Sequence, residues 1–584
     1  MSTHLDLADI QGNILRSYGL QNFPKARYIF LHFGDDNQKV QEFVEALRGE
    51  ITTAAPWEDD ASDSMDPQMQ AAAALKAAHP RLTAAVKALG HKDYHEIARD
   101  SGRVPLKKPK VTVNIALTWW GLVLLGLPIR TLQGMPQEFV DGMAKRASML
   151  GDPGRSDKIQ SAQHDHRDPA WLRNSGLTGI QAMVMLNAQM DFATGLPVPE
   201  LEAKTRMVRD LCAASGDPRL GVSIVGGHGA DGKAEWQDAS VRFDPEKIKQ
   251  GQHIPIGKEH FGFTDGFGDP VFKGQYPPGA MKVRVAGHGK IEPDQSWAPL
   301  ATGEFLLGHP DEAQEVPTAA MPLGFCRNGT FMAWRKLHQN IANFCDHIDT
   351  SAVDFAVVAG IGDLDEAKAT LRAKMAGRWD DGVPLSIAPT YADRVAFNQR
   401  RGAAGSIVDK AKLTLEMFDF KYGDDLHGAK CPVGAHMRRV NTRDMLDPEI
   451  DIEDALRSGS ALTNRRRIIR RGLPYGDNKR DNESEHGVVF MAICASLFRQ
   501  FEFVQQQWIQ YGLDFNAGND TCPLLGNHDG ETSKFVIPVA KDSATPPFVS
   551  GPLTQFVEFR GGDYFFIPSM TALRMMGMGI VDPT

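Results

Sequence analysis

The chain has 584 residues, of which 42% are hydrophobic and 23% are charged, and its formal net charge is −9. This length gives room for two or more domains with their own cores, and the composition is that of a globular protein. The acidic balance argues against a nucleic-acid partner and against an anionic membrane surface.

The first residues, MSTHLDLADIQGNILRSYG, carry acids where a secretory signal needs positive charge, so we expect no export signal. The most apolar run, Ile115 to Ile129, is shorter than the roughly 20 residues of a membrane span. The six cysteines lie far apart with no CxxC pair, which favours reduced, buried thiols over disulfides or a zinc site. We therefore expect a cytoplasmic protein with no membrane segment.

The first part of the chain alternates short strands and helices. Residues 27–33 predict a strand, and the next segment has apolar residues at helical spacing. A polar, alanine-rich insertion over about residues 51–108 precedes strands at KVTVNIALT and at residues 179–188. An amphipathic helix over 199–216 and a strand at LGVSIVG complete a β-α-β-β-α-β order, the ferredoxin-like pattern.

The second part repeats this order loosely. We expect a strand at GTFMAWRKL, a helix at HQNIANFCDHI, strands at RRIIRRG and GVVFMAICA, and a helix at SLFRQFEFVQQQWIQ. A pair of strands is expected around the Gly-Gly of QFVEFRGGDYFFIPS. The predicted fold is α+β, with two ferredoxin-like (βαββαβ) halves and long insertions. The predicted domains are residues 1–250 and 251–584.

Three segments place polar residues among glycines or apolar residues: GFTDG at 262–266, CPVGAHMRRVNTRD at 431–444 and NRRRIIRRGLPYG at 464–476. Each has an ordinary structural interpretation. Asp265 can sit in a turn and bond its own backbone. His436 can be a satisfied core histidine, and the arginines can form a solvated strand face.

The arginine run alternates with isoleucine in a way that matters. Period-2 geometry puts Arg466, Ile468 and Arg470 on one side of a strand, and Arg467, Ile469 and Arg471 on the other. Neither face is wholly polar, so we expect at least one arginine to point at something buried. A buried arginine needs a carboxylate, phosphate or propionate partner.

Taken together, the three segments resemble the dye-decolourising (DyP-type) haem peroxidase family. GFTDG matches its GxxDG motif, and the other two look like its proximal-histidine and distal-arginine segments. The resemblance extends to DIQGNILRSYG, GEFLLGHPDE, NGTFMAWRKLHQNIANF and GGDYFFIPSMTALR. It implies a DyP-type dimeric α+β barrel architecture with haem b (iron protoporphyrin IX) in the C-terminal half.

The resemblance also implies roles for individual residues. His436 is similar to the axial iron ligand, Asp265 to the distal acid-base residue and Arg470 to the distal arginine. Arg443 would lie near a haem propionate. Further residues implied at the cofactor are Phe490 and Val488, as walls of the distal cavity, and Asp520, as the acid that bonds the far nitrogen of His436.

Two positions depart from the family pattern. Where one subgroup has an Asn two residues after the distal arginine, this chain has Gly472, which leaves the distal work to Asp265 and Arg470. The usual NPR after the histidine segment reads NTR, which weakens the assignment of Arg443. The length resembles the larger bacterial or fungal-like branch.

The implied activity is a peroxidase that uses hydrogen peroxide to form a ferryl intermediate, which then oxidises dyes, phenolics or other bulky reductants. One positioned acid-base residue can move the peroxide proton between the two oxygens, and an arginine can stabilise charge on the leaving oxygen. An aspartate ordinarily titrates near ~3.9, so an acidic pH optimum is expected. Surface Tyr or Trp residues would relay electrons from bulky reductants.

Alternative readings of these segments stay open. The same fold could release iron or process porphyrin, with peroxidase activity incidental. The arginines at 465–471 could form a nucleic-acid-binding module, although aromatic residues for base stacking are missing there. HDHRD at 164–168 and the acidic WEDDASDSMD are interpreted as solvated loops. Hydrogen peroxide and an organic reductant are the expected partners, and a homo-oligomer is compatible with the sequence.

Overall fold

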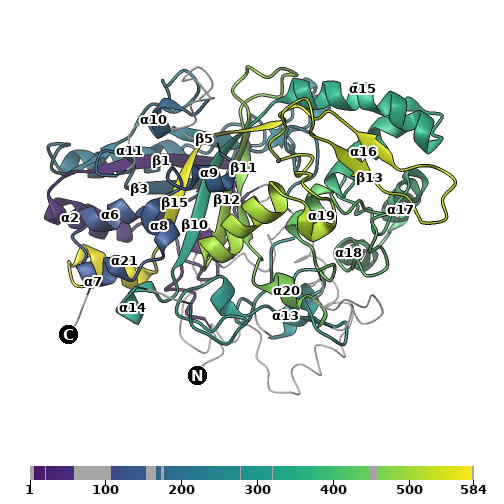
Figure 1. The fold of residues 1–584 in the computed structure, drawn as a ribbon. Coiled ribbons are helices and arrows are strands. Elements are labelled where there is room, and N and C mark those ends of the chain that lie inside the picture. The colour runs from purple at the N-terminus through teal and green to yellow at the C-terminus, as the bar shows by residue number, and fades with distance from the viewer. Residues whose placement is uncertain are drawn as a thin grey trace.

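A nine-stranded antiparallel sheet runs through both halves of the chain (Figure 1). The computed structural model describes residues 5–19, 22–57, 107–152, 166–172, 176–266, 268–276, 278–317, 320–446 and 458–581. The strands of this sheet are β1 (Lys25–Phe33), β2 (Val111–Leu117), β3 (Ala182–Ala188), β4 (Val222–Ile224), β5 (Gln237–Ser240), β10 (Thr330–Gln339), β11 (Ile469–Tyr475), β12 (Gly487–Cys494) and β15 (Val557–Ile567).

The strand order confirms two ferredoxin-like halves. It reads β11-β12-β10-β15-β2-β3-β1-β4, with β5 paired to β1. Within each half, the second strand in sequence is outermost, followed by the third, the first and the fourth. The halves join where β15 meets β2 at the pair Phe566 and Leu117. The predicted β-α-β-β-α-β order therefore holds in both halves, and their sheets are continuous.

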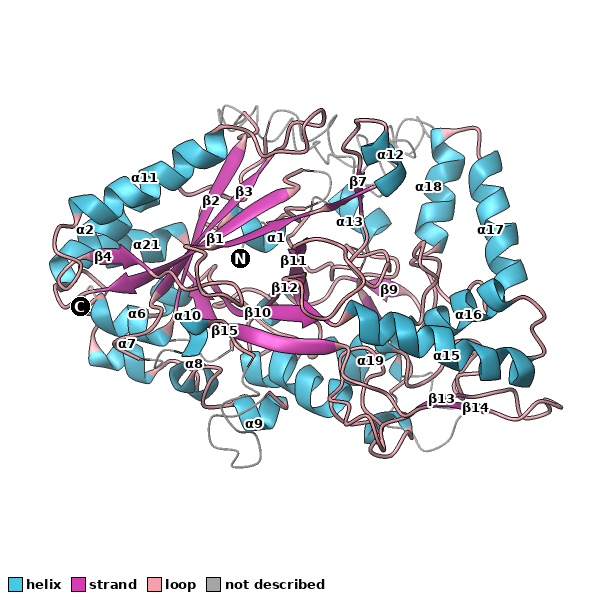
Figure 2. Ribbon diagram, turned by 90° about the horizontal axis from the view of Figure 1, so that it is seen from above, coloured by secondary structure: helices cyan, strands magenta, loops and turns pink. Residues whose placement is uncertain are grey.

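Helices complete each half. In the first, α2 (Asn37–Arg48) and α11 (Glu200–Ala214) connect the strands, and the residues of α2 predicted to face the core are buried: Val40, Phe43, Val44 and Leu47. In the second, α15 (Ile341–Ala359) follows β10. The final helix, α21 (Met570–Gly577), packs on α2, so the end of the chain returns to the first half (Figure 2).

The strands of the first half have a core on both faces. Ile29, Leu31 and Phe33 lie in one hydrophobic cluster, and Tyr28 and Phe30 lie in another. Alternate side chains of a strand point to opposite faces, so this split follows directly from the pleat. An apolar run without polar alternation, as in RYIFLHF, indicates a strand that is covered on both sides.

Three predicted elements differ from the structure. The strand expected at RRIIRRG begins only at Ile469 and continues to Tyr475. The helix expected at SLFRQFEFVQQQWIQ is two π-helical segments, η4 (Leu497–Glu502) and η5 (Val504–Ile509). Such wide turns have no distinct apolar period in sequence, because their hydrophobic spacing resembles that of an α-helix.

The predicted strand pair around Gly-Gly is wrong, because β15 runs through Gly561 and Gly562 as one strand. A register shift opposite Lys336 and Leu337 marks an irregularity at this point. Gly561 has φ +149, and a Cβ there would lie 2.0 Å from Cδ1 of Trp171. The glycines therefore allow a close approach to an indole ring, and they do not form a turn.

The remaining elements surround this sheet. Three short two-stranded sheets pair β6 (Arg242–Phe243) with β7 (Pro255–Ile256), β8 (Lys290–Ile291) with β9 (Trp297–Ala298), and β13 (Phe535–Ile537) with β14 (Phe548–Ser550). The shorter helices of the first half and of the linking segments are α1 (Gly12–Leu15), α6 (Trp119–Leu124), α7 (Ile129–Gln133), α8 (Gln137–Asp141), α9 (Ala147–Leu150), α10 (Pro169–Leu172), α12 (Pro245–Lys249), α13 (Pro278–Arg284) and α14 (Leu323–Cys326).

Insertions of the second half form a helical region at the end of the molecule away from α2 and α11 (Figures 1 and 2). Its helices are α16 (Leu364–Ala376), α17 (Tyr391–Ala403), α18 (Ile407–Glu416) and α19 (His436–Val440), whereas α20 (Ala461–Asn464) lies beside α13 (Figure 1). No helix among the described ranges is both long enough and apolar enough to cross a membrane. Most of the predicted insertion over 51–108 lies outside the described residues, and the predicted domain boundary after residue 250 falls between β6 and β7.

Candidate active site

The loop that carries Asp265 is a small hairpin held at its base. Lys258 and Thr264 form a β-bridge, and the amide of Asp265 donates to the carbonyl of Gly257 at 2.7 Å. The exposed carboxylate of Asp265 accepts from the amide of Gly266 at 2.6 Å. Gly262 and Gly266 have φ +90 and +85, which a residue with a side chain rarely adopts.

Buried contacts fix this hairpin against the second half. Glu259 accepts from the amides of Phe261 at 2.7 Å and Phe263 at 2.8 Å, and burial raises the pKa of its carboxyl group. The hydroxyl of Thr264 donates to the carbonyl of Asp380 at 2.6 Å. The local bond of the Asp265 carboxylate matches the turn interpretation, while these anchors hold the same carboxylate in a defined place.

Strand β11 places Arg470 on the face of the sheet that carries the predicted wall residues. Arg470 pairs with Ala492 across β12, Gly472 with Phe490, and Pro474 with Val488. Directly paired residues of antiparallel strands share a face, as do alternate residues of one strand. Arg470, Phe490 and Val488 are each half-buried on that face.

The Asp265 hairpin continues into contact with Arg470. A Cβ at Gly268 would lie 3.7 Å from Nη2 of Arg470, so the loop backbone passes against the guanidinium. Asp269 accepts from the amide of Arg470 at 3.2 Å and forms an ion pair with Arg471. The glycine-rich loop and the arginine strand, which are about two hundred residues apart, therefore meet in the fold.

His436 is the first residue of α19, directly after the N-cap Ala435. Burial is the largest cause that lowers the pKa of His436 to about 4, followed by the charges of Arg470 and Arg439. The ring nevertheless keeps accessible surface and is only half-buried. The charge of Arg470 also lowers the pKa of His436, so the two residues lie near each other.

Buried arginines hold the turn that presents His436. Arg438 pairs with Asp425 at 2.9 Å. Arg439 donates to four backbone carbonyls at 2.9 to 3.0 Å, those of Gly434, Trp508, Tyr511 and Asp520. Because both guanidiniums are fully enclosed, the helix start at His436 is fixed from two sides.

The expected partner of His436 is replaced by another residue. Nδ1 of His436 faces Sγ of Cys522 at 3.3 Å. The carboxylate of Asp520 instead pairs with Lys534, and its carbonyl accepts from Arg439. The residue beside Nδ1 of His436 is therefore Cys522 and not the predicted Asp520, which lies two positions earlier. The salt bridge to Lys534 draws the carboxylate of Asp520 away.

Arg443 belongs to a group of three buried arginines that bond backbone carbonyls. It donates to the carbonyl of Phe418 at 2.9 Å, Arg467 to those of His288 and Gly289 at 3.1 Å, and Arg378 to that of Gly382 at 2.8 Å. Burial, the largest cause, lowers the pKa of each guanidinium to about 10.

Neutral carbonyls do not compensate buried positive charge as a carboxylate does, so this group favours an anion. Sequence reasoning singled out Arg443 but missed Arg378 and Cys522. No short motif in the sequence marks either of them.

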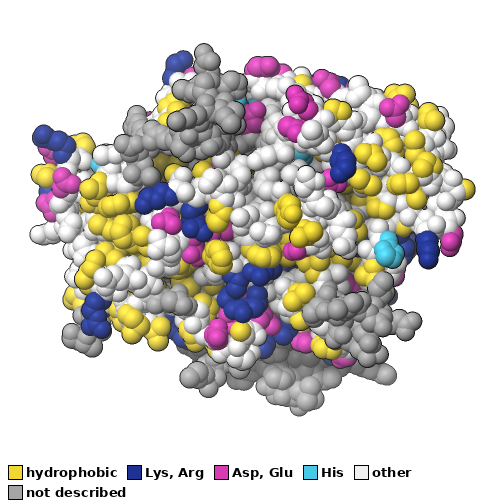
Figure 3. Space-filling model, viewed as in Figure 1, with side chains coloured by type: hydrophobic (Ala, Val, Ile, Leu, Met, Phe, Trp, Pro, Cys, Tyr) yellow, Lys and Arg dark blue, Asp and Glu magenta, His cyan; other side chains and the backbone are white. Residues whose placement is uncertain are grey.

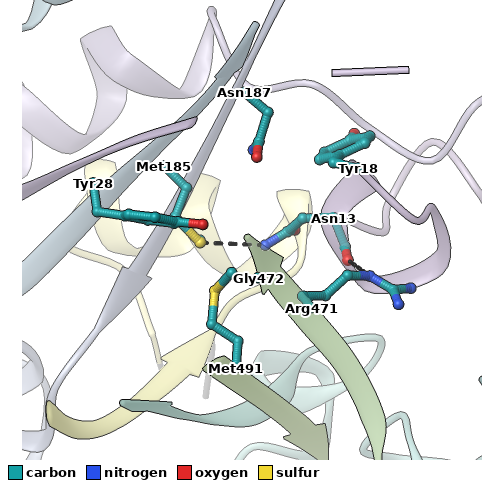
Figure 4. A pocket seen from close by; sticks show the side chains of 8 residues that line it. All are labelled: Asn13, Tyr18, Tyr28, Met185, Asn187, Arg471, Gly472 and Met491. Carbon is teal, nitrogen blue, oxygen red and sulfur yellow. Dashed lines mark hydrogen bonds between the residues drawn. The ribbon is translucent and has the colours of Figure 1, made fainter. Parts of the chain in front are cut away.

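A small cavity lies on the opposite face of β11 and β12 (Figure 4). Its volume is about 10 Å³, which is the space of roughly one water molecule. Arg471, which lines it, donates to the carbonyl of Asn13, and the amide of Asn13 lies 3.6 Å from Sδ of Met185. This cavity has no room for an organic cofactor, whereas the other face of the two strands carries Arg470, Phe490 and Val488.

The arginines at 465–471 are engaged within the protein. Arg465 pairs with Asp311 at 2.8 Å, Arg466 lies over the ring of Phe503 at 3.6 Å, and Arg471 pairs with Asp269. On the face shown in Figure 3, one group of basic side chains lies below the centre, with acidic and hydrophobic side chains beside it. These contacts disfavour a phosphate-binding stripe of free arginines.

The segment HDHRD lies only partly within the described residues. His164 lies outside the described residues, whereas His166 lies within them. Across the part of the chain that the structure describes, no group of three His, Cys, Asp or Glu side chains could hold a metal ion. WEDDASDSMD begins at Trp57, and all but that residue lies outside the described ranges.

Known proteins similar to this chain are peroxidases. It is 26% identical over 491 residues to Peroxidase 2 of Mycetinis scorodonius, covering 80% of this chain and 76% of that protein. It is 26% identical over 482 residues to dye-decolorizing peroxidase AauDyP1 of Auricularia auricula-judae, covering 80% and 75% respectively. No family model matches the chain.

The fold is also similar to solved structures. An ancestral D-type dye decolorizing peroxidase aligns with TM-score 0.65 and 22% identity, covering 98% of this chain and 99% of that one. A fungal DyP-type peroxidase from Auricularia auricula-judae aligns with TM-score 0.63 and 21% identity, covering 99% of both chains. The alignments span both halves of the sheet and the insertions of the second half.

Proposed function

We propose that this chain, which belongs to the dye-decolourising peroxidase family and is a peroxidase, binds haem b at His436 and reduces hydrogen peroxide beside Arg470 and Asp265. The observation that carries this proposal is the convergence of three distant segments. Arg470 contributes to the lowered pKa of His436, and the loop of Asp265 passes against the guanidinium of Arg470.

The residues present fit a haem. Burial lowers the pKa of His436, which favours its neutral form, and a neutral imidazole is the form that donates to iron. The buried guanidiniums of Arg378, Arg443 and Arg467 supply positive charge for the two propionates. Haem, when bound, supplies the redox chemistry by which peroxide oxidises a second substrate.

Asp265 and Arg470 would perform the proton and charge work. The carboxylate of Asp265 would accept the proton from one oxygen of peroxide and return it to the other oxygen, which leaves. Arg470 carries a permanent charge that stabilises negative charge developing on the leaving oxygen. Phe490 and Val488 share the face of Arg470 and would limit the water that reaches it.

The finer parts of the activity belong to the same proposal. Dyes, phenolics or other bulky reductants would donate electrons from the surface, because Phe490 and Val488 narrow the approach to Arg470. We also propose an acidic pH optimum. The proton transfer uses both the ionised and the protonated form of Asp265, and an aspartate ordinarily has both forms only at acidic pH. A cytoplasmic location is proposed on the six cysteines, all of which are free.

The test is the rate at which the haem-loaded protein reacts with one equivalent of peroxide, followed by stopped-flow absorbance. We expect Asp265→Ala to slow this step by ~10²–10⁴-fold, as loss of a general acid-base residue does. Arg470→Leu should slow it by ~10²–10³-fold through loss of charge stabilisation.

Matched controls are Asp231→Ala and Arg219→Leu, which remove an exposed carboxylate and an exposed guanidinium. Both should react at the wild-type rate. Wild-type rates in the two site variants would contradict the assignment. A slow wild-type reaction would favour iron release or porphyrin processing on the same fold.

A further inference from the structure

The contact between His436 and Cys522 joins a predicted iron ligand to a residue that no motif marks. Nδ1 of His436 and Sγ of Cys522 are 3.3 Å apart, and Cys522 is completely buried. With Nδ1 engaged in this way, Nε2 is the ring nitrogen left to bind a metal. The nitrogen that faces sulfur must then carry the proton and donate it.

The backbone of Cys522 is held by three hydrogen bonds. Its amide donates to the carbonyl of Ile509 at 2.7 Å. Its carbonyl accepts from the amide of Gly526 at 2.8 Å and lies 3.0 Å from Nε2 of His528. These bonds fix the backbone of Cys522, and its completely buried side chain places the sulfur beside the imidazole.

A carboxylate that could have taken this place is drawn elsewhere. Asp520, two residues before Cys522, pairs with Lys534 through its side chain. Its carbonyl accepts from Arg439 at 2.9 Å, and Arg439 also bonds the carbonyl of Gly434, two residues before His436. The same network thus fixes the histidine turn and turns the acid away from it.

We infer that Cys522 is the positioning residue for His436, and that its sulfur sets the donor strength of the axial imidazole. This inference rests on the proposed function. A ligating histidine usually donates its second N–H to a carboxylate, carbonyl or water, and this bond fixes the ring and raises its basicity. Sulfur is a weak acceptor, so the imidazole keeps less anionic character than a carboxylate would give it.

The consequence is a measurable property of the bound haem. An imidazole that donates less electron density to iron stabilises the ferric state less. The reduction potential therefore lies higher than it would with a carboxylate at position 522. The strength of the iron–histidine bond changes in parallel, because it follows the basicity of the ring. Neither quantity depends on the rate of peroxide turnover.

The experiment compares haem-loaded wild type with Cys522→Asp, Cys522→Ala and Cys522→Ser. The readouts are the midpoint potential and the iron–histidine stretching frequency of the ferrous protein by resonance Raman spectroscopy. We expect Cys522→Asp to lower the potential and raise the frequency, and Cys522→Ala to move both in the opposite direction. Cys522→Ser places a small hydrogen-bonding group at the same position. It replaces Cys522→Asp in the comparison if the buried carboxylate prevents folding.

Cys326→Ala is the matched control, because Cys326 is equally buried but lies in α14. It should leave both readouts at the wild-type values. Normal haem uptake with identical potentials and frequencies in all the Cys522 variants would overturn the inference and leave the proposed function intact. A wild-type chain that takes up no haem would overturn the proposed function and this inference with it.

Discussion

Burial determines the protonation of several single residues, including the histidine of the proposed site. It is the largest cause that lowers the pKa of His436, His260, His338 and His347 to about 4 and that of His288 to about 3. An unfolded histidine binds a proton below about pH 6.5, whereas these folded ones do so only near pH 4 or below. Acid therefore favours the unfolded chain.

The protein should lose stability as the pH falls. Each buried imidazole stabilises the folded protein fully above pH 6.5, and the contribution falls as pH drops from 6.5 toward 4. Urea unfolding followed at pH 7.5, 6, 5 and 4.5 should give progressively lower midpoints. A midpoint that stays constant over this range would contradict the lowered pKa of these histidines.

A single substitution isolates the histidine contribution. His288→Asn keeps a group that can bond the carbonyl of Asp269, which Nδ1 of His288 meets at 2.9 Å, but it cannot take up a proton. Its unfolding midpoint should depend less steeply on pH than that of the wild type. The proposed acidic optimum of activity is thus limited on its acid side by the stability of the fold.

At the scale of elements, the strand that presents Arg470 requires a glycine two residues later. Gly472 has φ +135, and a Cβ there would lie 1.9 Å from the carbonyl oxygen of Val489 on β12. The Asn that one subgroup of the family has at this position could not be accommodated without a change of strand geometry. The departure from the family pattern at Gly472 is therefore structural as well as chemical.

Gly472→Ala should destabilise the protein by about 1–3 kcal/mol, because it combines backbone strain with a clash. Gly402→Ala is the matched control, since Gly402 lies in α17 and a Cβ there meets nothing within 4 Å. That change should stabilise by roughly 0.5–1 kcal/mol through helix propensity. Denaturant unfolding measures both, and equal midpoints for the two variants would refute the role given to Gly472.

Elements with a strong local pattern could be predicted from the sequence, and irregular ones could not. The apolar spacing of α2 and the unbroken apolar strand β1 appear as expected. The bulge at Gly561 and the π-helical turns η4 and η5 do not, because they depend on Trp171 and on packing rather than on periodicity. At the site, Cys522 was missed because no spacing rule links it to His436.

At the scale of the whole molecule, the two halves hold each other in place. Buried ion pairs join Arg335 of β10 to Asp152, and Lys336 to Asp168. Arg471 of β11 donates to the carbonyl of Ile14 at 2.9 Å, so the first residues of the chain brace the strand that carries Arg470. The division into domains at residue 250 remains a prediction, but the strands on both sides of it share one sheet.

The central claim is that His436 holds a haem, and the absorption spectrum of the purified, haem-reconstituted protein tests it most directly. The wild type and the exposed-histidine control His427→Ala should show the same Soret band with one haem per chain, which one equivalent of peroxide shifts. His436→Ala, folded by circular dichroism, should lose that band or show the spectrum of loosely held haem. An unchanged Soret band and peroxide response in His436→Ala would contradict the account.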